Sequence, residues 1–253
     1  MQPTTSSTKE DKGAVKLHLL MDHDGYLPSF AVITEGKKHE IRVARHMQFA
    51  RGTILAFDRG YTDYEWFTNL TKQGVYFVTR LKENADYGVV EKREVPQRRG
   101  VVRDEVVFFY KLEQENKKAF FRRIEFYDEE HDRVLVFLTN HLELAAATVA
   151  AIYKERWQIE LFFRALKQSL RVKTFVGTSA NALKTQLWTA LIAMLVVKYL
   201  QLRSTFGWSL SNLVALLRQQ LFVYRDLWAW IDDPFQPPPI PERPSEQLRL
   251  QLI

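Results

Sequence analysis

Cysteine is the one amino acid that this 253-residue sequence lacks entirely. Its absence excludes disulfide bonds and thiolate metal sites, and it fits a protein of a reducing compartment. The polar residues 1–12, which we expect to be disordered, have no apolar stretch of the kind that a secretion signal requires. The longest apolar run, Leu187 to Val197, is too short to span a bilayer and predicts a buried helix.

Basic residues outnumber acidic ones, with 36 Lys and Arg against 30 Asp and Glu, and the net charge is +6. This mild bias favours a polyanionic partner. The excess is local, because residues 152–174 hold six basic residues and two acids, whereas residues 82–133 hold 12 basic and 13 acidic residues. We therefore expect the positive field around residues 152–174.

The segment YKERWQIELFFRALK, from Tyr153 to Lys167, has no Pro or Gly and is rich in helix-forming residues, which predicts one helix. At about 100° per residue, four polar side chains fall within a narrow arc, and apolar side chains gather on the opposite side. The four are Tyr153, Arg156, Glu160 and Lys167, with Arg164 beside them. A surface helix with Glu160 paired to Arg156 or Arg164 would explain this face without any function.

The spacing of these four residues, Tyr-(2)-Arg-(3)-Glu-(6)-Lys, is more specific than a surface pair. It resembles the signature of insertion-sequence transposases with an Asp-Asp-Glu active site, in insertion-sequence family four. The likeness covers roughly residues 13 to 205. Residues 13–40 resemble the family's hairpin after the first catalytic strand, residues 54–67 the segment of its second catalytic Asp, and residues 175–193 the helix after the signature.

The resemblance implies a transposase that cleaves and joins double-stranded DNA at transposon ends and target sites with Mg²⁺ (or Mn²⁺). Asp58 and Glu160 map onto the second and third catalytic acids, and would be the catalytic and metal-binding residues. Tyr153, Arg156 and Lys167, with Arg164 beside them, would bind DNA phosphates. From the residues alone, Asp58 follows a buried strand, where an Asp is also commonly a turn or N-cap residue.

Hard divalent cations prefer carboxylate oxygens, and phosphodiester chemistry needs such cations beside the attacking and leaving oxygens. In the family the first catalytic Asp precedes the hairpin. Here twelve residues precede Gly13, and their only acids are Glu10 and Asp11, without a strand pattern. We therefore expect a truncated copy or a fragment that lacks the first strand and the first Asp, with unpaired sheet edges and impaired activity.

An alternative is a catalytically inactive DNA-binding remnant or inhibitor that pairs with a full-length transposase. A third interpretation, a structure-specific nuclease on the same scaffold, would not need the Tyr, Arg and Lys spacing. The resemblance further implies a homodimer, no membrane partner, and a cytoplasmic, nucleoid-associated location in a bacterium.

The predicted fold class is α/β, an RNase H-like catalytic core with its first strand missing, an inserted antiparallel β subdomain and C-terminal helices. The expected domains are the N-terminal half of the core (13–81), the β insertion (82–133), the C-terminal half of the core with the helices (134–232) and a Pro-rich tail (233–253). Strands are predicted at 15–21, 27–34, 53–57, 75–80 and 134–138. Helices are predicted at 39–50, at 62–72 with Thr62 as N-cap, from about 142 into the signature helix with a break near Ala151, at 181–203 and at 209–230.

Overall fold

The computed structural model describes residues 15–35, 40–95, 100–117, 119–169, 179–220 and 222–235. The chain forms two compact units. The first unit comprises residues 1–164 and 175–185, and the second comprises residues 165–174 and 186–253. The predicted disordered N-terminus and nearly all of the predicted Pro-rich tail lie outside the described residues.

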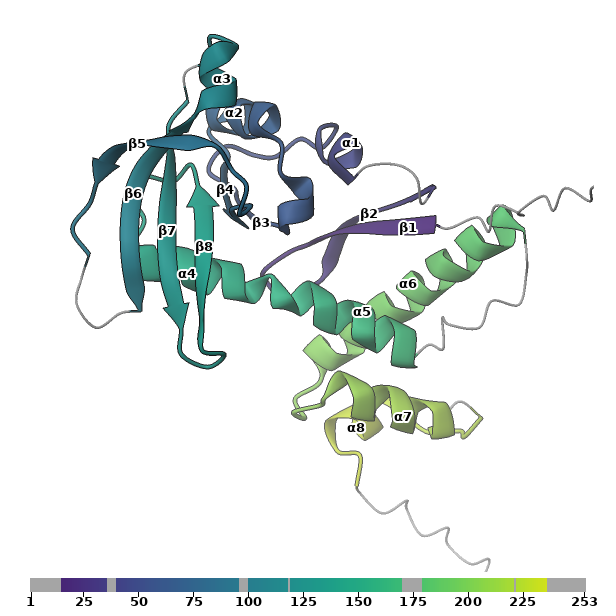
Figure 1. The fold of residues 1–253 in the computed structure, drawn as a ribbon. Coiled ribbons are helices and arrows are strands. Elements are labelled where there is room, and N and C mark those ends of the chain that lie inside the picture. Colours follow the sequence, from purple (N-terminus) through teal and green to yellow (C-terminus); the bar gives the residue numbers. More distant parts are fainter. Residues whose placement is uncertain are drawn as a thin grey trace, which may run out of the picture. The chain divides into compact units, whose positions relative to one another are not determined.

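The centre of the first unit is a six-stranded sheet (Figure 1) with the strand order β3-β4-β8-β7-β6-β5. β3 and β4 run parallel, and every other neighbouring pair is antiparallel. The strands are β3 (Ile54–Ala56), β4 (Tyr76–Arg80), β5 (Tyr87–Lys92), β6 (Val101–Phe109), β7 (Phe121–Asp128) and β8 (Arg133–Thr139). The strands predicted at 53–57 and 75–80 are thus confirmed, but β3 is not fully buried as predicted, since Ile54 and Ala56 are exposed and only Leu55 is buried.

The N-terminal hairpin forms a sheet of its own. β1 (Val15–Met21) pairs antiparallel with β2 (Pro28–Glu35), and neither is hydrogen-bonded to the larger sheet. Among the described strands, β3 is therefore an edge strand of the six-stranded sheet.

Residues 82–133 are antiparallel, as the sequence predicts, but they do not form a separate sheet. β5, β6 and β7 extend the same sheet as β4, to which β8 connects them. A short helix that the sequence does not predict, α3 (Tyr110–Gln114), follows β6 directly.

Alternate residues of β4 face the two sides of the sheet. Phe77 belongs to a cluster that holds Phe67 of helix α2 (Tyr64–Gln73), whereas Val78 belongs to a cluster that holds Val149 of helix α4 (Ala146–Glu155). Because successive side chains of a strand point to opposite faces, α2 and α4 cover opposite faces of the sheet. Residues of β4 at even positions therefore lie on the face that α4 covers.

The N-cap prediction for α2 is wrong. Asp63, not Thr62, caps the helix, because its side chain accepts a hydrogen bond from the Trp66 backbone N–H, as N-cap residues do. The helix ends at Gly74, whose φ of 70° is the left-handed conformation that glycine adopts without strain.

Three other helix predictions need correction. The helix expected at 39–50 is only α1 (Glu40–Ala44). The signature region is two helices, α4 and α5 (Trp157–Ser169), instead of one. The helix expected at 209–230 is also two, α7 (Leu210–Gln220) and α8 (Leu227–Asp232), because Asp226 starts a new helix by accepting a hydrogen bond from the Ala229 N–H.

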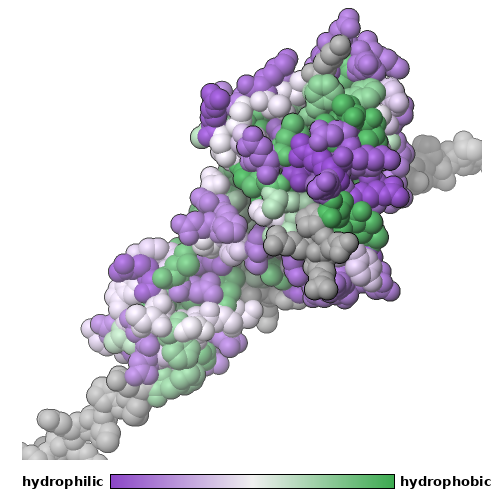
Figure 2. Space-filling model, turned by 90° about the vertical axis from the view of Figure 1, so that its left-hand side faces the viewer, coloured by the Kyte–Doolittle hydropathy of each residue, from purple (hydrophilic) through white to green (hydrophobic). Residues whose placement is uncertain are grey.

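The second unit is helical, and most of α6 (Ala180–Arg203), α7 and α8 belong to it. The sequence predicts a buried α6, but only one side is buried, and Trp188 is 42% exposed. Hydrophobic residues accordingly reach the surface in patches between hydrophilic ones on the face shown in Figure 2. By length and composition alone, α6 is the one described helix that is long and apolar enough to cross a membrane.

The hydrogen bonds of Asn140 allow a test of their contribution to the stability of the fold. Its buried side chain accepts a hydrogen bond from the Phe77 N–H (2.9 Å) and donates to the Val75 carbonyl and the Thr71 hydroxyl (both 2.9 Å). Asn140→Ala removes these partners from the buried Phe77 N–H and the Val75 carbonyl. We expect it to lower the free energy of unfolding by roughly 2–4 kcal/mol in a denaturant titration.

The matched control is Asn84→Ala, at an exposed turn position, which should change the free energy of unfolding by less than about 0.5 kcal/mol. Equal effects of the two substitutions would refute the structural role of Asn140.

Candidate functional site

Asp58 lies directly beyond the carboxyl end of β3. The strand pairing continues past its last residue, because the Phe57 N–H donates to the Val78 carbonyl (3.2 Å). The Asp58 carboxylate accepts a hydrogen bond from the Gly60 N–H (2.9 Å) and caps a 3₁₀ turn, Arg59–Tyr61. Asp58 is exposed, so the side chain has the N-cap role that its sequence context allows and still faces solvent.

The signature residues follow one helical path with a tight turn in it. α4 ends at Glu155 and α5 begins at Trp157, and the two continue in the same direction (Figure 1). At Arg156 the hydrogen bonds shorten to i→i−3, from Arg156 N–H to the Tyr153 carbonyl (3.1 Å) and from Ile159 N–H to the Arg156 carbonyl (3.2 Å). The predicted break near Ala151 is wrong, since Ala151 lies inside α4.

Arg156 connects the other groups of the site. Its Nη2 donates to Glu160 Oε1 (2.8 Å), and its guanidinium lies over the Tyr153 ring, 5.2 Å from the ring centroid. Burial lowers the pKa of Arg156, but the nearby Tyr153, Glu160 and Asp58 outweigh burial and raise it. Arg156 therefore stays charged and interacts with both Asp58 and Glu160.

Tyr153 is a buried residue rather than part of an open polar face. Its side chain is 8% exposed, and its ring packs against Phe137 of β8 with the ring centroids 5.1 Å apart. Burial raises the pKa of the Tyr153 hydroxyl, the charge of Asp58 raises it further, and Arg156 and Arg80 act in the opposite direction. The phenol is thus neutral near pH 7 and can donate a hydrogen bond.

The remaining signature cations lie further along α5. Arg164 and Lys167 are both exposed. Arg164 belongs to the first unit and Lys167 to the second. The structure therefore joins Tyr153, Arg156 and Glu160 by direct contacts, and the charge of Asp58 acts on Tyr153 and Arg156. The functional roles of these residues and of Arg164 and Lys167 remain predictions.

Arg80 is a residue of this site that the sequence does not reveal. It is the last residue of β4, and its charge acts on Tyr153. Its Nε is buried, and among the described residues it has no hydrogen-bond partner. The signal that would have identified it is its position, since it ends the second strand of the parallel pair just as Asp58 follows the first.

The donor set fits a hard divalent cation. Asp58 and Glu160 each accept a hydrogen bond at one oxygen, from Gly60 and Arg156 respectively, and a carboxylate has further lone pairs. Two carboxylates are fewer ligands than Mg²⁺ or Mn²⁺ takes, so water and phosphate oxygens would have to complete the shell.

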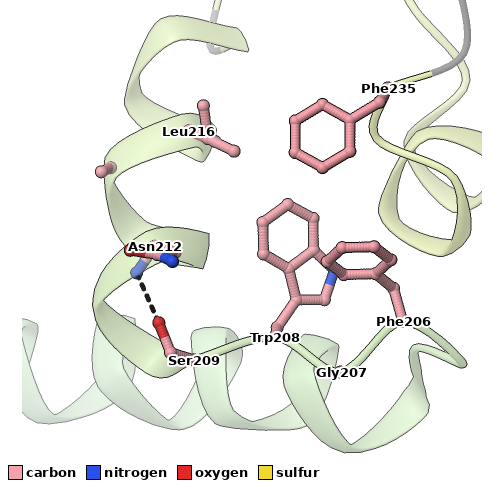
Figure 3. Close-up of a pocket in the computed structure, with 8 residues that line it drawn as sticks. Phe206, Gly207, Trp208, Ser209, Asn212, Leu216 and Phe235 are labelled. Carbon is pink, nitrogen blue, oxygen red and sulfur yellow. Dashed lines mark hydrogen bonds between the residues drawn. The ribbon is translucent and has the colours of Figure 1, made fainter.

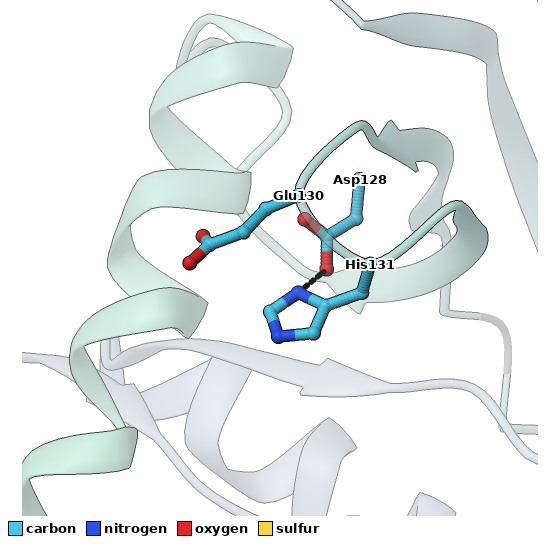
Figure 4. Close-up of side chains that lie close together, drawn as sticks. All are labelled: Asp128, Glu130 and His131. Carbon is cyan, nitrogen blue, oxygen red and sulfur yellow. Dashed lines mark hydrogen bonds and ion pairs between the residues drawn. The ribbon is translucent and has the colours of Figure 1, made fainter.

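A second acidic group lies at the turn between β7 and β8. Asp128, Glu130 and His131 offer ligand atoms within 4.8 Å of one another (Figure 4), and they are the one group of three or more such residues among the residues that the structure describes. Each already has a protein partner, because His131 bonds to Asp128 (2.9 Å) and Lys154 to Glu130 (3.0 Å). The group includes neither Asp58 nor Glu160.

The second unit contains a pocket of about 350 Å³ between α7 and the segment before it. Aromatic rings of Phe206, Trp208 and Phe235 face this space (Figure 3). No residue that lines it has a charged side chain, so this pocket offers no opposite charge to a cation or a phosphate.

Comparisons with known proteins match the part of the chain that holds Asp58 and the signature residues. The sequence model of the family described as "Transposase DDE domain" matches residues 1–196. The protein y4zB of Sinorhizobium fredii, assigned as a transposase, is 30% identical over 230 residues, which are 89% of this chain and 63% of y4zB.

Two further relatives carry similar assignments. A protein of Geobacillus stearothermophilus, assigned as the transposase of insertion sequence element IS5377, is 28% identical over 75% of this chain and 50% of its own length. A Synechocystis protein assigned to insertion sequence element IS4SA is 24% identical over 76% of this chain and 55% of its own length. The chain thus spans between half and two thirds of the relatives it matches, and it belongs to the family of transposases with a DDE domain.

Proposed function

We propose that this chain supplies the catalytic core of an insertion-sequence transposase of family four, which cleaves and joins DNA phosphodiesters at the element's ends. The observation that carries the proposal is the arrangement around Arg156. This cation pairs with Glu160 and lies over Tyr153, and the charge of Asp58 acts on it. In the sequence, Asp58 precedes the β-rich segment 82–133 and Glu160 follows it. A phosphate that binds Arg156 would then lie beside Glu160 and within the field of Asp58.

Each residue has a role that follows from its chemistry. Asp58 and Glu160 would hold Mg²⁺ or Mn²⁺, which activates an attacking oxygen and stabilises a leaving oxygen when bound. Arg156 offers a planar fork of donors to phosphate oxygens, and neutral Tyr153 adds one O–H donor. Arg164 and Lys167, both exposed on α5, would contact phosphates further along the DNA.

We infer that cleavage by the 253-residue chain alone is impaired. The family pattern places three acids at the metal, and the described residues place two near Arg156. The separate β1–β2 sheet and the edge position of β3 support this inference, because an RNase H-like core joins such strands through a further strand. The double-stranded DNA of element ends and target would be the substrate, in a homodimer or a pair with a longer transposase, in the bacterial cytoplasm at the nucleoid.

A non-catalytic DNA-binding role is favoured by one specific observation. Both candidate ligands already have protein partners, since Glu160 pairs with Arg156 at 2.8 Å and Asp58 caps a 3₁₀ turn. A site of this kind can bind a phosphate through its cations without a metal.

Metal-dependent nicking tests the catalytic proposal. Wild-type protein should nick supercoiled plasmid DNA slowly in Mn²⁺. Asp58→Asn, which keeps the oxygen that caps the turn, and Glu160→Gln should each slow nicking roughly 100-fold, because each removes one anionic ligand. Gel densitometry of the nicked form measures the rate.

Asp86→Asn is the matched control, since Asp86 is an exposed loop acid outside this site, and its nicking rate should equal that of the wild type. Nicking that survives Asp58→Asn would show that the site is assigned wrongly.

The binding role makes a different prediction. DNA binding in EDTA should weaken steeply as salt rises, because cations that contact phosphates displace counterions. Glu160→Gln should leave this binding unchanged, since the glutamine oxygen still accepts from Arg156, and no cleavage should occur. Fluorescence anisotropy with a labelled duplex measures both the affinity and the salt dependence, and a loss of binding in Glu160→Gln alone would count against a purely binding role.

A further inference from the structure

Arg80 is placed beside Asp58 by the pairing of the two parallel strands. Ala56 lies opposite Val78 in the β3–β4 register. The pairing continues one residue further, since the Phe57 N–H donates to the Val78 carbonyl and the Thr79 hydroxyl donates to the Phe57 carbonyl (2.9 Å). Extending the register by two residues on each strand sets residue 58 opposite residue 80.

The other neighbour of Arg80 leads to the signature helix. In the antiparallel pairing of β4 with β8, Arg80 lies opposite Phe137, so their side chains are on the same face of the sheet. Phe137 packs on the Tyr153 ring at 5.1 Å. Arg80 is therefore on the α4 face, between the end of β3 on one side and the Phe137–Tyr153 pair on the other, and its charge acts on Tyr153.

Two arginines near Tyr153 have a buried Nε atom. The Nε atoms of Arg80 and Arg156 have no hydrogen-bond partner among the described residues, which is also true of Arg93 and Arg123 in the β-rich segment. A buried donor without a partner is costly, and at Arg80 and Arg156, which lie near Tyr153 and the end of β3, a ligand could supply the acceptor. Arg122 is a contrast within the same sheet, since its Nε donates to Asp104 (2.7 Å).

We propose that Arg80 is a further DNA-phosphate-binding residue, which together with Arg156 holds one phosphodiester group beside Asp58 from two sides. An anionic phosphate oxygen is the acceptor that these donors lack, and a guanidinium can offer two N–H groups to it. The proposal rests on the proposed function for its substrate, DNA, but not on cleavage. The two can therefore fail separately.

The test measures DNA binding in EDTA, where no cleavage can interfere, with the full 253-residue chain and a fluorescent duplex over a series of salt concentrations. Arg80→Gln should reduce the slope of log affinity against log salt by about 0.9, the value for one phosphate contact on duplex DNA. The control Arg103→Gln removes a surface arginine whose side chain is 62% exposed, and should leave the slope unchanged. A folded Arg80→Gln protein with the wild-type slope would overturn the proposal.

Arg80→Lys keeps the charge and serves if the glutamine variant does not fold. The lysine ammonium is a point charge and cannot replace the planar pair of N–H donors of the guanidinium, so we expect Arg80→Lys to bind DNA roughly fivefold more weakly than the wild type. Wild-type affinity in a folded Arg80→Lys protein would then overturn the proposal. Nicking in Mn²⁺ is measured separately. If the wild type does not nick DNA but Arg80→Gln still reduces the salt slope, the catalytic function is rejected and the phosphate contact is retained.

Discussion

The parallel pairing of β3 with β4 is the constraint on which the rest of the site depends. It brings the carboxyl ends of two strands to the same edge of the sheet, so that Asp58 follows one strand where Arg80 ends the other. The alternation of side chains then directs Phe77 into one apolar cluster and Val78 into the other. Because α4 packs on the Val78 side, its residue Tyr153 lies on the same face as Arg80.

Charges of both signs lie at this edge, and one ion pair, Arg156 with Glu160, joins them. Arg156 is partly buried, which disfavours its charge, but its contacts with Glu160 and Tyr153 and the charge of Asp58 keep it protonated. A phosphodiester carries negative charge and therefore fits between arginines. In the proposed function, a divalent cation would be held by the carboxylates of Asp58 and Glu160, beside the phosphate that it activates.

The sequence predicted the elements that carry the site better than the details of their ends. Hydrophobic runs at 53–57 and 75–80 are strong strand signals, and the structure confirms both. The turn at Arg156 could not be predicted, since the segment is rich in helix formers and its dihedral angles remain helical. The helical periodicity of the sequence put Tyr153 on a polar face. The burial of Tyr153 depends on its packing against Phe137, which is 16 residues away in sequence. Arg80 was missed for the same reason, because only the strand register sets it beside Asp58.

The most direct test of the proposed site is the position of a bound metal. Crystals of the chain with a DNA duplex and Mn²⁺ would give an anomalous difference map that locates the ion without assumptions about activity. We predict a peak between the carboxylates of Asp58 and Glu160, with a phosphate oxygen near Arg156. A peak confined to the group of Asp128, Glu130 and His131, with none at Asp58 and Glu160, would contradict the proposed site.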